Sequence, residues 1–163
     1  MSIKTTVESY LSRCPHQAGQ TVQFGWFVFR IAGHGQPPQV ESLDFRQIAS
    51  FTQDFSETER IHTLQTATLA RFSASECPCT LWQSALVSLS YSSKHANAFI
   101  ERQKPTDNND SGWYVGVRDE TLNMDDPSSF ARRSLYDLTI HDMRMAAYWL
   151  LPTGTVVLLD ESA

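Results

Sequence analysis

Hydrophobic positions recur at helical spacing in three parts of the chain. Near the amino end this spacing predicts a short amphipathic helix over residues 3–13. A second helix is predicted over 57–72, with Ser56 as its N-cap and Glu59 completing a capping box. Apolar positions over 129–150 predict one or two further helices.

Other segments are rich in β-branched and aromatic residues, which favour strands. The predicted strands are 21–31, 39–46, 82–91, 113–118 and 155–160, and residues 97–103 fit either a strand or a helical turn. Because strands follow one another through polar turns, the pattern indicates an α+β fold with a mainly antiparallel sheet packed against helices. The length of 163 residues is typical of one domain, so we expect a single α+β domain over 1–163.

The composition is that of a globular protein, with 41% hydrophobic and 11% aromatic residues. No apolar run approaches the ~20 residues that a membrane helix needs. The beginning of the chain also lacks the apolar stretch of a secretory signal. We therefore expect a cytoplasmic protein that has no membrane partner.

The odd count of three cysteines argues against a closed disulfide framework. Cys77 and Cys79 enclose a single residue, and no second Cys/His pair follows at zinc-finger spacing. Two reduced side chains in a turn are the expected structure there, with a metal site left as the alternative. The acidic run from Asp107 fails as a calcium loop because Arg118 stands where a bidentate glutamate belongs. No metal and no cofactor are expected.

The charge of the chain is concentrated in one segment. The formal net charge is −5, and residues 107–126 account for all of it, since the remaining chain holds 12 acidic and 12 basic residues. An acidic chain disfavours nucleic acid as a direct partner. The carboxylates of this segment are Asp107, Asp110, Asp119, Glu120, Asp125 and Asp126.

An aromatic pair, Trp113 and Tyr114, lies within the acidic segment. Neighbours in a strand point to opposite faces, so we expect one of the two rings in the core and the other at a binding surface with the acids. The alternative is that both rings are buried and the acids only solvate loops. The chain lacks the common catalytic motifs, but the adjacent His141 and Asp142 leave a small enzyme acting on a cationic substrate as another alternative. A regulatory protein-binding module is a third.

An ordered set of motifs resembles a known family. The set is Asp110-Ser111-Gly112-Trp113, then Asp119-Glu120-Thr121, then Asp125-Asp126-Pro127. It is similar to a bacterial family of small immunity proteins that share a D-S-G-W core and accompany polymorphic toxins. The resemblance covers about 84–160 and leaves 1–80 as an N-terminal elaboration. Arg118 and Met124 depart from the family pattern. The resemblance implies that Asp110-Ser111-Gly112 sets a turn and that Trp113 is a core residue, which leaves Tyr114 for binding.

The resemblance implies an inhibitor and not an enzyme. Such a protein would bind a cognate secreted toxin, with type VI secretion as the expected route of delivery, and would cover a basic active-site cleft with an acidic surface. The predicted partner-binding residues are Asp107, Asp110, Tyr114, Asp119, Glu120, Asp125 and Asp126.

Overall fold

The structure, a computed structural model, describes residues 2–33, 35, 37–92, 96–118, 121 and 126–159. Its contacts group into two compact units, Met1–Leu64 and Gln65–Ala163. Both units combine helices with mostly antiparallel strands, so the α+β prediction is confirmed. That the two units act as one domain stays a prediction.

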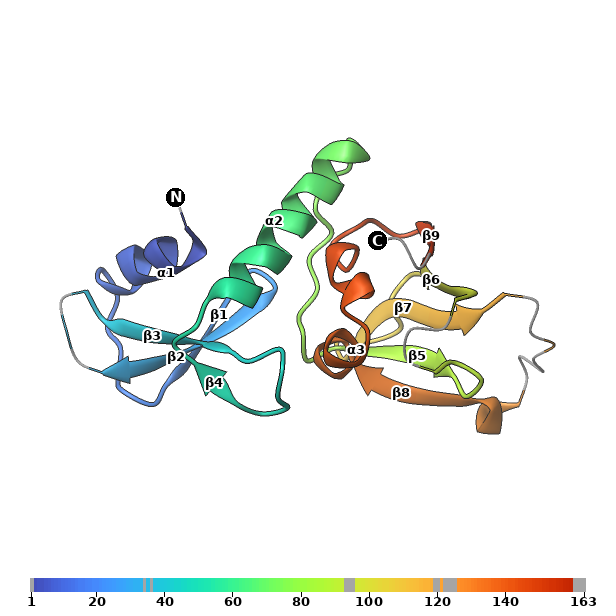
Figure 1. Ribbon diagram of the computed structural model, residues 1–163, viewed down its shortest axis with the longest axis horizontal. Coiled ribbons are helices and arrows are strands. Elements are labelled where there is room, and N and C mark those ends of the chain that lie inside the picture. The colour runs from blue at the N-terminus through green and yellow to red at the C-terminus, as the bar shows by residue number, and fades with distance from the viewer. Residues whose placement is uncertain are drawn as a thin grey trace. The chain divides into compact units, whose positions relative to one another are not determined.

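The first unit contains a four-stranded antiparallel sheet in the order β1-β2-β3-β4 (Figure 1). Its elements are α1 (Ile3–Leu11), β1 (Thr21–Phe24), β2 (Phe27–Gly33), β3 (Gln39–Leu43) and β4 (Phe51–Thr52). The prediction of one strand over 21–31 is wrong, because the chain turns back on itself between β1 and β2. Gly25 makes this tight turn possible with a φ of 59°, in the left-handed region that glycine enters without steric cost.

Stacked aromatic rings form much of the core of this unit. Trp26 stacks on Phe45 with 5.7 Å between ring centroids, and Phe29 stacks on Phe55 at 6.0 Å. The helix that follows, α2 (Ser56–Arg71), belongs to the first unit as far as Leu64 and to the second from Gln65. Each of its ends lies within one residue of the predicted bounds. The prediction of Ser56 as the N-cap is wrong, because Ser56 is the first helical residue. The Asp54 carboxylate accepts the Ser56 N–H at 2.9 Å.

The second unit contains a five-stranded sheet in the order β8-β5-β7-β6-β9, in which only β5 and β7 run parallel (Figure 1). Its strands are β5 (Ser84–Ser88), β6 (Ala98–Arg102), β7 (Asp110–Val117), β8 (Phe130–Ser134) and β9 (Val156–Leu158). Its helices are η1 (Pro127–Ser129), α3 (Leu135–His141) and η2 (Met143–Ala147). The strands β5, β6 and β9 lie where the sequence predicts strands.

The predicted helical region over 129–150 is wrong at its start, where the structure has β8. This strand pairs antiparallel with β5 along its whole length, from Ser84 opposite Ser134 to Ser88 opposite Phe130. Backbone pairing with β5 outweighs the local helical spacing. Ser134 then ends the strand and caps α3, since its hydroxyl accepts the Asp137 N–H at 3.1 Å.

The D-S-G-W motif lies in β7 rather than in a turn, so that prediction is also wrong. The motif forms an irregularity in the strand: Ser84 of β5 faces Asp110, whereas Leu86 faces Tyr114. Over this stretch β5 advances by two residues and β7 by four, which is the signature of a bulge.

Gly112 permits this bulge. Its φ is 77°, and a Cβ at this position would collide with the carbonyl oxygen of Gln103 on the adjacent chain segment. That close approach allows Gln103 N–H to donate to the Gly112 carbonyl at 2.7 Å. Ser111 ties the bulge to β5 on the other side of β7, because its hydroxyl donates to the Ser84 carbonyl at 2.8 Å.

Trp113 joins the sheet to its helical cover, as predicted for a core residue. Its indole N–H donates to the Trp149 carbonyl at 3.1 Å, and the two rings meet edge to face at 5.5 Å. Trp149 in turn donates its own indole N–H to the Thr139 hydroxyl of α3 at 2.9 Å. All three side chains are buried, so one face of the sheet is closed by the segment from α3 to Trp149.

We predict that Gly112→Ala lowers the free energy of unfolding by about 3 kcal/mol or more, because alanine meets both the left-handed φ and the Gln103 carbonyl. Gly154→Ala is the matched control, since Gly154 has a φ of 89° but open space around it. It should cost only about 1 kcal/mol. Denaturant unfolding measures both, and equal losses would contradict the role given to the Gln103 contact.

Candidate functional site

The second face of the five-stranded sheet is only partly covered by the described residues. One row crosses all five strands in register: Arg132, Leu86, Tyr114, Glu101 and Val156. At the β9 edge Val156 is 60% exposed, and its neighbour on this face, Leu158, is 48% exposed. We call the surface formed by this row together with Phe99, Phe130 and Leu158 the open face.

Three aromatic rings form the middle of the open face. Tyr114 meets Phe99 edge to face at 5.7 Å and Phe130 at 6.2 Å. They fit because Gly116 lies beneath them: a Cβ there would stand 2.7 Å from Tyr114 and 2.8 Å from Phe99. Tyr114 is therefore held firmly, and with 9% of its surface exposed it presents little more than an edge.

A hollow of about 140 Å³ adjoins this face beside the bulge. Its lining comes from β5, from β7, from β8 and from the segment after β6. The lining residues are Leu86, Gln103, Lys104, Thr106, Asp110, Gly112, Trp113, Tyr114 and Arg132. Two of the predicted partner-binding residues, Asp110 and Tyr114, therefore meet in one place.

Asp110 is turned inward and is 8% exposed. One carboxylate oxygen accepts the Gly112 N–H at 3.0 Å, and the other accepts the N–H and the hydroxyl of Thr106, both at 2.9 Å. Burial raises the pKa of this carboxyl, but the hydrogen bonds from Thr106 and Gly112 and the charge of Arg132 outweigh it and hold the pKa below its ordinary value. Asp110 is thus a carboxylate that shapes the hollow.

The three acidic residues of the segment 107–126 that the structure describes, Asp107, Asp110 and Asp126, do not form one cluster. Asp107 accepts the Asn109 N–H at 2.7 Å and lies at the Ser84 end of β5, because the Asn109 carbonyl accepts the Ser84 N–H. Asp126 lies beyond the opposite end of that strand, where it caps η1. The five residues of β5, which span roughly 17 Å, therefore lie between Asp107 and Asp126. Asp119, Glu120 and Asp125 lie outside the described residues.

The Asp126 carboxylate has a local role. It accepts the hydroxyl of Ser128 at 2.7 Å and the N–H of the same residue at 2.9 Å. These two hydrogen bonds lower the pKa of the carboxyl. Asp126 therefore keeps its charge at neutral pH at a half-buried position.

His141 and Asp142 do not form a catalytic pair. The His141 ring lies 2.8 Å from the Asp137 carbonyl and 3.1 Å from the Asp137 carboxylate, one helical turn back. The Asp142 carboxylate is buried and accepts hydrogen bonds from the Tyr91 hydroxyl at 2.9 Å and from Arg144 at 2.7 Å. Burial first, and then the Asp142 charge, raise the pKa of Tyr91. These contacts fix the start of η2.

The cysteines and the other metal-ligating residues form no metal site in the part of the chain that the structure describes. Cys79 is buried and its thiol lies 3.1 Å from the Trp149 carbonyl, so burial raises its pKa to about 12. Cys14 and Cys77 are also free thiols. Among the described helices, none has the length and apolar character required to cross a membrane.

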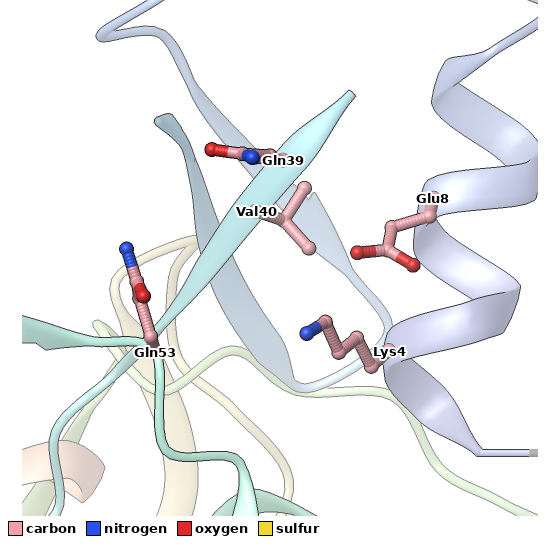
Figure 2. Close-up of a pocket in the computed structure, with 5 residues that line it drawn as sticks. All are labelled: Lys4, Glu8, Gln39, Val40 and Gln53. Carbon is pink, nitrogen blue, oxygen red and sulfur yellow. The ribbon is translucent and has the colours of Figure 1, made fainter. Parts of the chain in front are cut away.

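A second hollow, of about 150 Å³, lies in the first unit between α1 and β3 (Figure 2). Lys4 and Glu8 extend toward it from α1, and Val40 faces them from β3, while Gln39 and Gln53 complete the lining. The Lys4 ammonium also lies over the Phe55 ring, 5.2 Å from its centroid. This hollow contains none of the residues predicted to bind a partner.

The sequence interpretation missed several residues of the open face and its hollow. Lys104 and Arg132 are 28 positions apart in the sequence, so no local pattern indicates that they line one hollow. Phe99, Val156 and Leu158 each lie in a predicted strand or possible strand, and alternation within β9 could have indicated an exposed apolar edge.

Comparison with known families gives one match. A model of the Imm33-like domain, which is an immunity-protein-like family, matches residues 64–163. The match begins 20 residues before the region of expected resemblance and includes the whole five-stranded sheet. No curated protein and no solved structure matches the chain. The resemblance to an immunity-protein family is confirmed, whereas the D-S-G-W signature and the toxin system stay predictions.

We predict that Asp110→Asn lowers the free energy of unfolding by about 2 kcal/mol at neutral pH, because an amide cannot accept all three hydrogen bonds and carries no charge. The folded-state pKa lies below the unfolded value of 3.8, so this stabilisation is present above that pH. It disappears as the pH falls through the folded pKa.

Urea unfolding of the wild type and of Asp110→Asn, from acidic to neutral pH, measures the difference in their free energies of unfolding. The control is Asp126→Asn, because asparagine is as good a capping residue as aspartate, and its stability should stay close to the wild type. A difference for Asp110→Asn that does not shrink in acid would contradict the electrostatic explanation.

Proposed function

The chain belongs to the Imm33-like domain family, and from this premise we propose that it is an immunity protein that binds and neutralises a cognate secreted bacterial toxin. The observation that carries the proposal is the family match over 64–163, the region that contains the open face. Proteins of an immunity-like family act by binding a partner protein and are generally not enzymes. No residue pair in the described chain offers a better-supported catalytic alternative, since His141 and Asp142 have separate structural contacts.

We propose that the acids act mainly by steering. Asp107 and Asp126 lie beyond opposite ends of β5, so their field spreads across the sheet and is not focused on one point. Asp119, Glu120 and Asp125 belong to the same acidic segment of the chain. Such charges raise the association rate with a basic toxin cleft and contribute less to the lifetime of the complex.

Asp110 and Tyr114 have a different part in this proposal. Asp110 is buried and fully engaged with Thr106 and Gly112, so it acts as a positioning residue for the hollow. Tyr114 contributes the exposed edge of its ring at the centre of the open face.

Co-expression tests the function. The polypeptide encoded by the reading frame directly before this gene is expressed in a bacterial host, alone and together with this chain. We expect growth arrest in the first case, and growth together with co-purification of the two chains in the second. Continued arrest while both chains are produced would contradict the proposed neutralisation.

The steering role predicts a salt-dependent effect. Replacing Asp107, Asp119, Glu120, Asp125 and Asp126 by their amides should lower the association rate constant about tenfold at low salt. The difference should nearly vanish at about 0.5 M salt, where the Debye length falls to a few ångströms. Stopped-flow association with the co-purified toxin measures both rates.

The dissociation rate serves as the internal control for the same variant and should change less than about threefold. An unchanged association rate at low salt would remove the acids from the mechanism.

A further inference from the structure

The hollow beside the bulge is cationic although the chain as a whole is acidic. Lys104 and Arg132 both line it, and among the described residues of its lining Asp110 is the one carboxylate. Lys104 is exposed and makes no ion pair within the described chain. Its ammonium group is therefore available to an incoming anion.

Arg132 also has hydrogen-bond donors available to a ligand. Its side chain is 53% exposed, and one terminal nitrogen donates to the Ser84 hydroxyl at 3.1 Å. The same nitrogen lies 3.8 Å from the Asp110 carboxylate, beyond hydrogen-bond distance. Asp110 forms an ion pair with this nitrogen but accepts its hydrogen bonds from Thr106 and Gly112, so the second terminal nitrogen of Arg132 has no hydrogen bond within the described chain.

The size of the hollow selects the ligand. A volume of about 140 Å³ is well below the ~300–1,000 Å³ of typical small-molecule sites, so it suits one side chain and not a nucleotide. Leu86 and Tyr114 supply apolar wall, while Gln103 and Thr106 supply polar groups. A short aliphatic stem that ends in a carboxylate matches this lining.

The hollow is continuous with an apolar surface. Leu86 and Tyr114 belong both to its lining and to the open face, and the same row of the sheet ends at the exposed Val156. Apolar contact around a charged pair excludes water and strengthens the pair. Leu86, Tyr114 and Val156 all lie on strands, so little ordering of the backbone is needed when a partner binds this surface.

We propose that this hollow is a specificity pocket that receives the carboxylate of an aspartate or glutamate side chain of the partner protein, with Lys104 and Arg132 as its ligands, while apolar residues around that side chain pack on the open face. The inference rests on the proposed function for the identity of the partner. It assigns the centre of the interface to a cationic pocket and leaves the acids the role of steering.

The first test uses the toxin polypeptide from the co-expression experiment. Lys104→Glu should weaken its binding to this chain about 30-fold, measured by titration calorimetry, because a charge reversal sets two carboxylates against each other. The matched control is Arg13→Glu, an exposed position in the first unit where the same change in net charge should alter the dissociation constant less than threefold. Equal changes in the dissociation constant for Lys104→Glu and Arg13→Glu would overturn the proposed pocket.

A second test does not need the toxin. N-acetyl-glutamate-N-methylamide is titrated into the ¹⁵N-labelled chain at millimolar concentration, with the corresponding blocked glutamine and inorganic phosphate as separate probes. We expect saturable shifts of the Lys104, Thr106 and Gly112 amide signals with glutamate alone, and their loss in the double variant Lys104→Glu, Arg132→Gln. Equal shifts with glutamine, or tighter binding of phosphate, would overturn the assignment of a carboxylate.

The two tests separate the two proposals. If the toxin does not bind the wild type while blocked glutamate still occupies the hollow, the proposed function fails and the pocket stands. If the toxin binds, but neither its binding nor that of blocked glutamate depends on Lys104 and Arg132, the pocket fails and the proposed function stands.

Discussion

The close backbone approach at Gly112 is the constraint on which the second unit depends. Gln103 lies against the position that a Cβ would occupy, so β7 can pass β6 at this distance only with glycine there. The left-handed φ of Gly112 accommodates the two extra residues of β7 that bring Tyr114 opposite Leu86. Every cross-strand row beyond the bulge follows from that register, including the row that forms the open face.

Buried polar groups hold the closed side of the same sheet. Arg102 is fully buried, and one of its terminal nitrogens donates to the carbonyls of Cys77, Trp149 and Leu151, with the shortest distance 2.6 Å. The Trp149 carbonyl also accepts a hydrogen bond from the Trp113 indole N–H and lies near the Cys79 thiol. A buried cation without such acceptors would be strongly destabilising, so Arg102 fixes where the chain after η2 must lie.

The two faces of the sheet thus have different physical characters. Trp113 and Arg102 are tied to the helical cover, whereas Tyr114, Phe99 and Phe130 brace one another above Gly116 and leave partly exposed rings. A rigid, partly apolar surface that contains a small cationic hollow is suited to binding another protein. Its location inside the region that matches the Imm33-like domain gives that surface its proposed role.

The sequence by itself determined the α+β class, most strand positions, α2, the core position of Trp113 and membership of an immunity-protein family. These depend on local composition, residue spacing and ordered motifs, all of which are readable along the chain. Only the tertiary structure decided that 130–134 pairs as β8, that Asp110 turns inward, and that Lys104 joins Arg132 at one hollow. Those outcomes depend on contacts between segments far apart in the chain, where strand pairing and backbone sterics outweigh local preference.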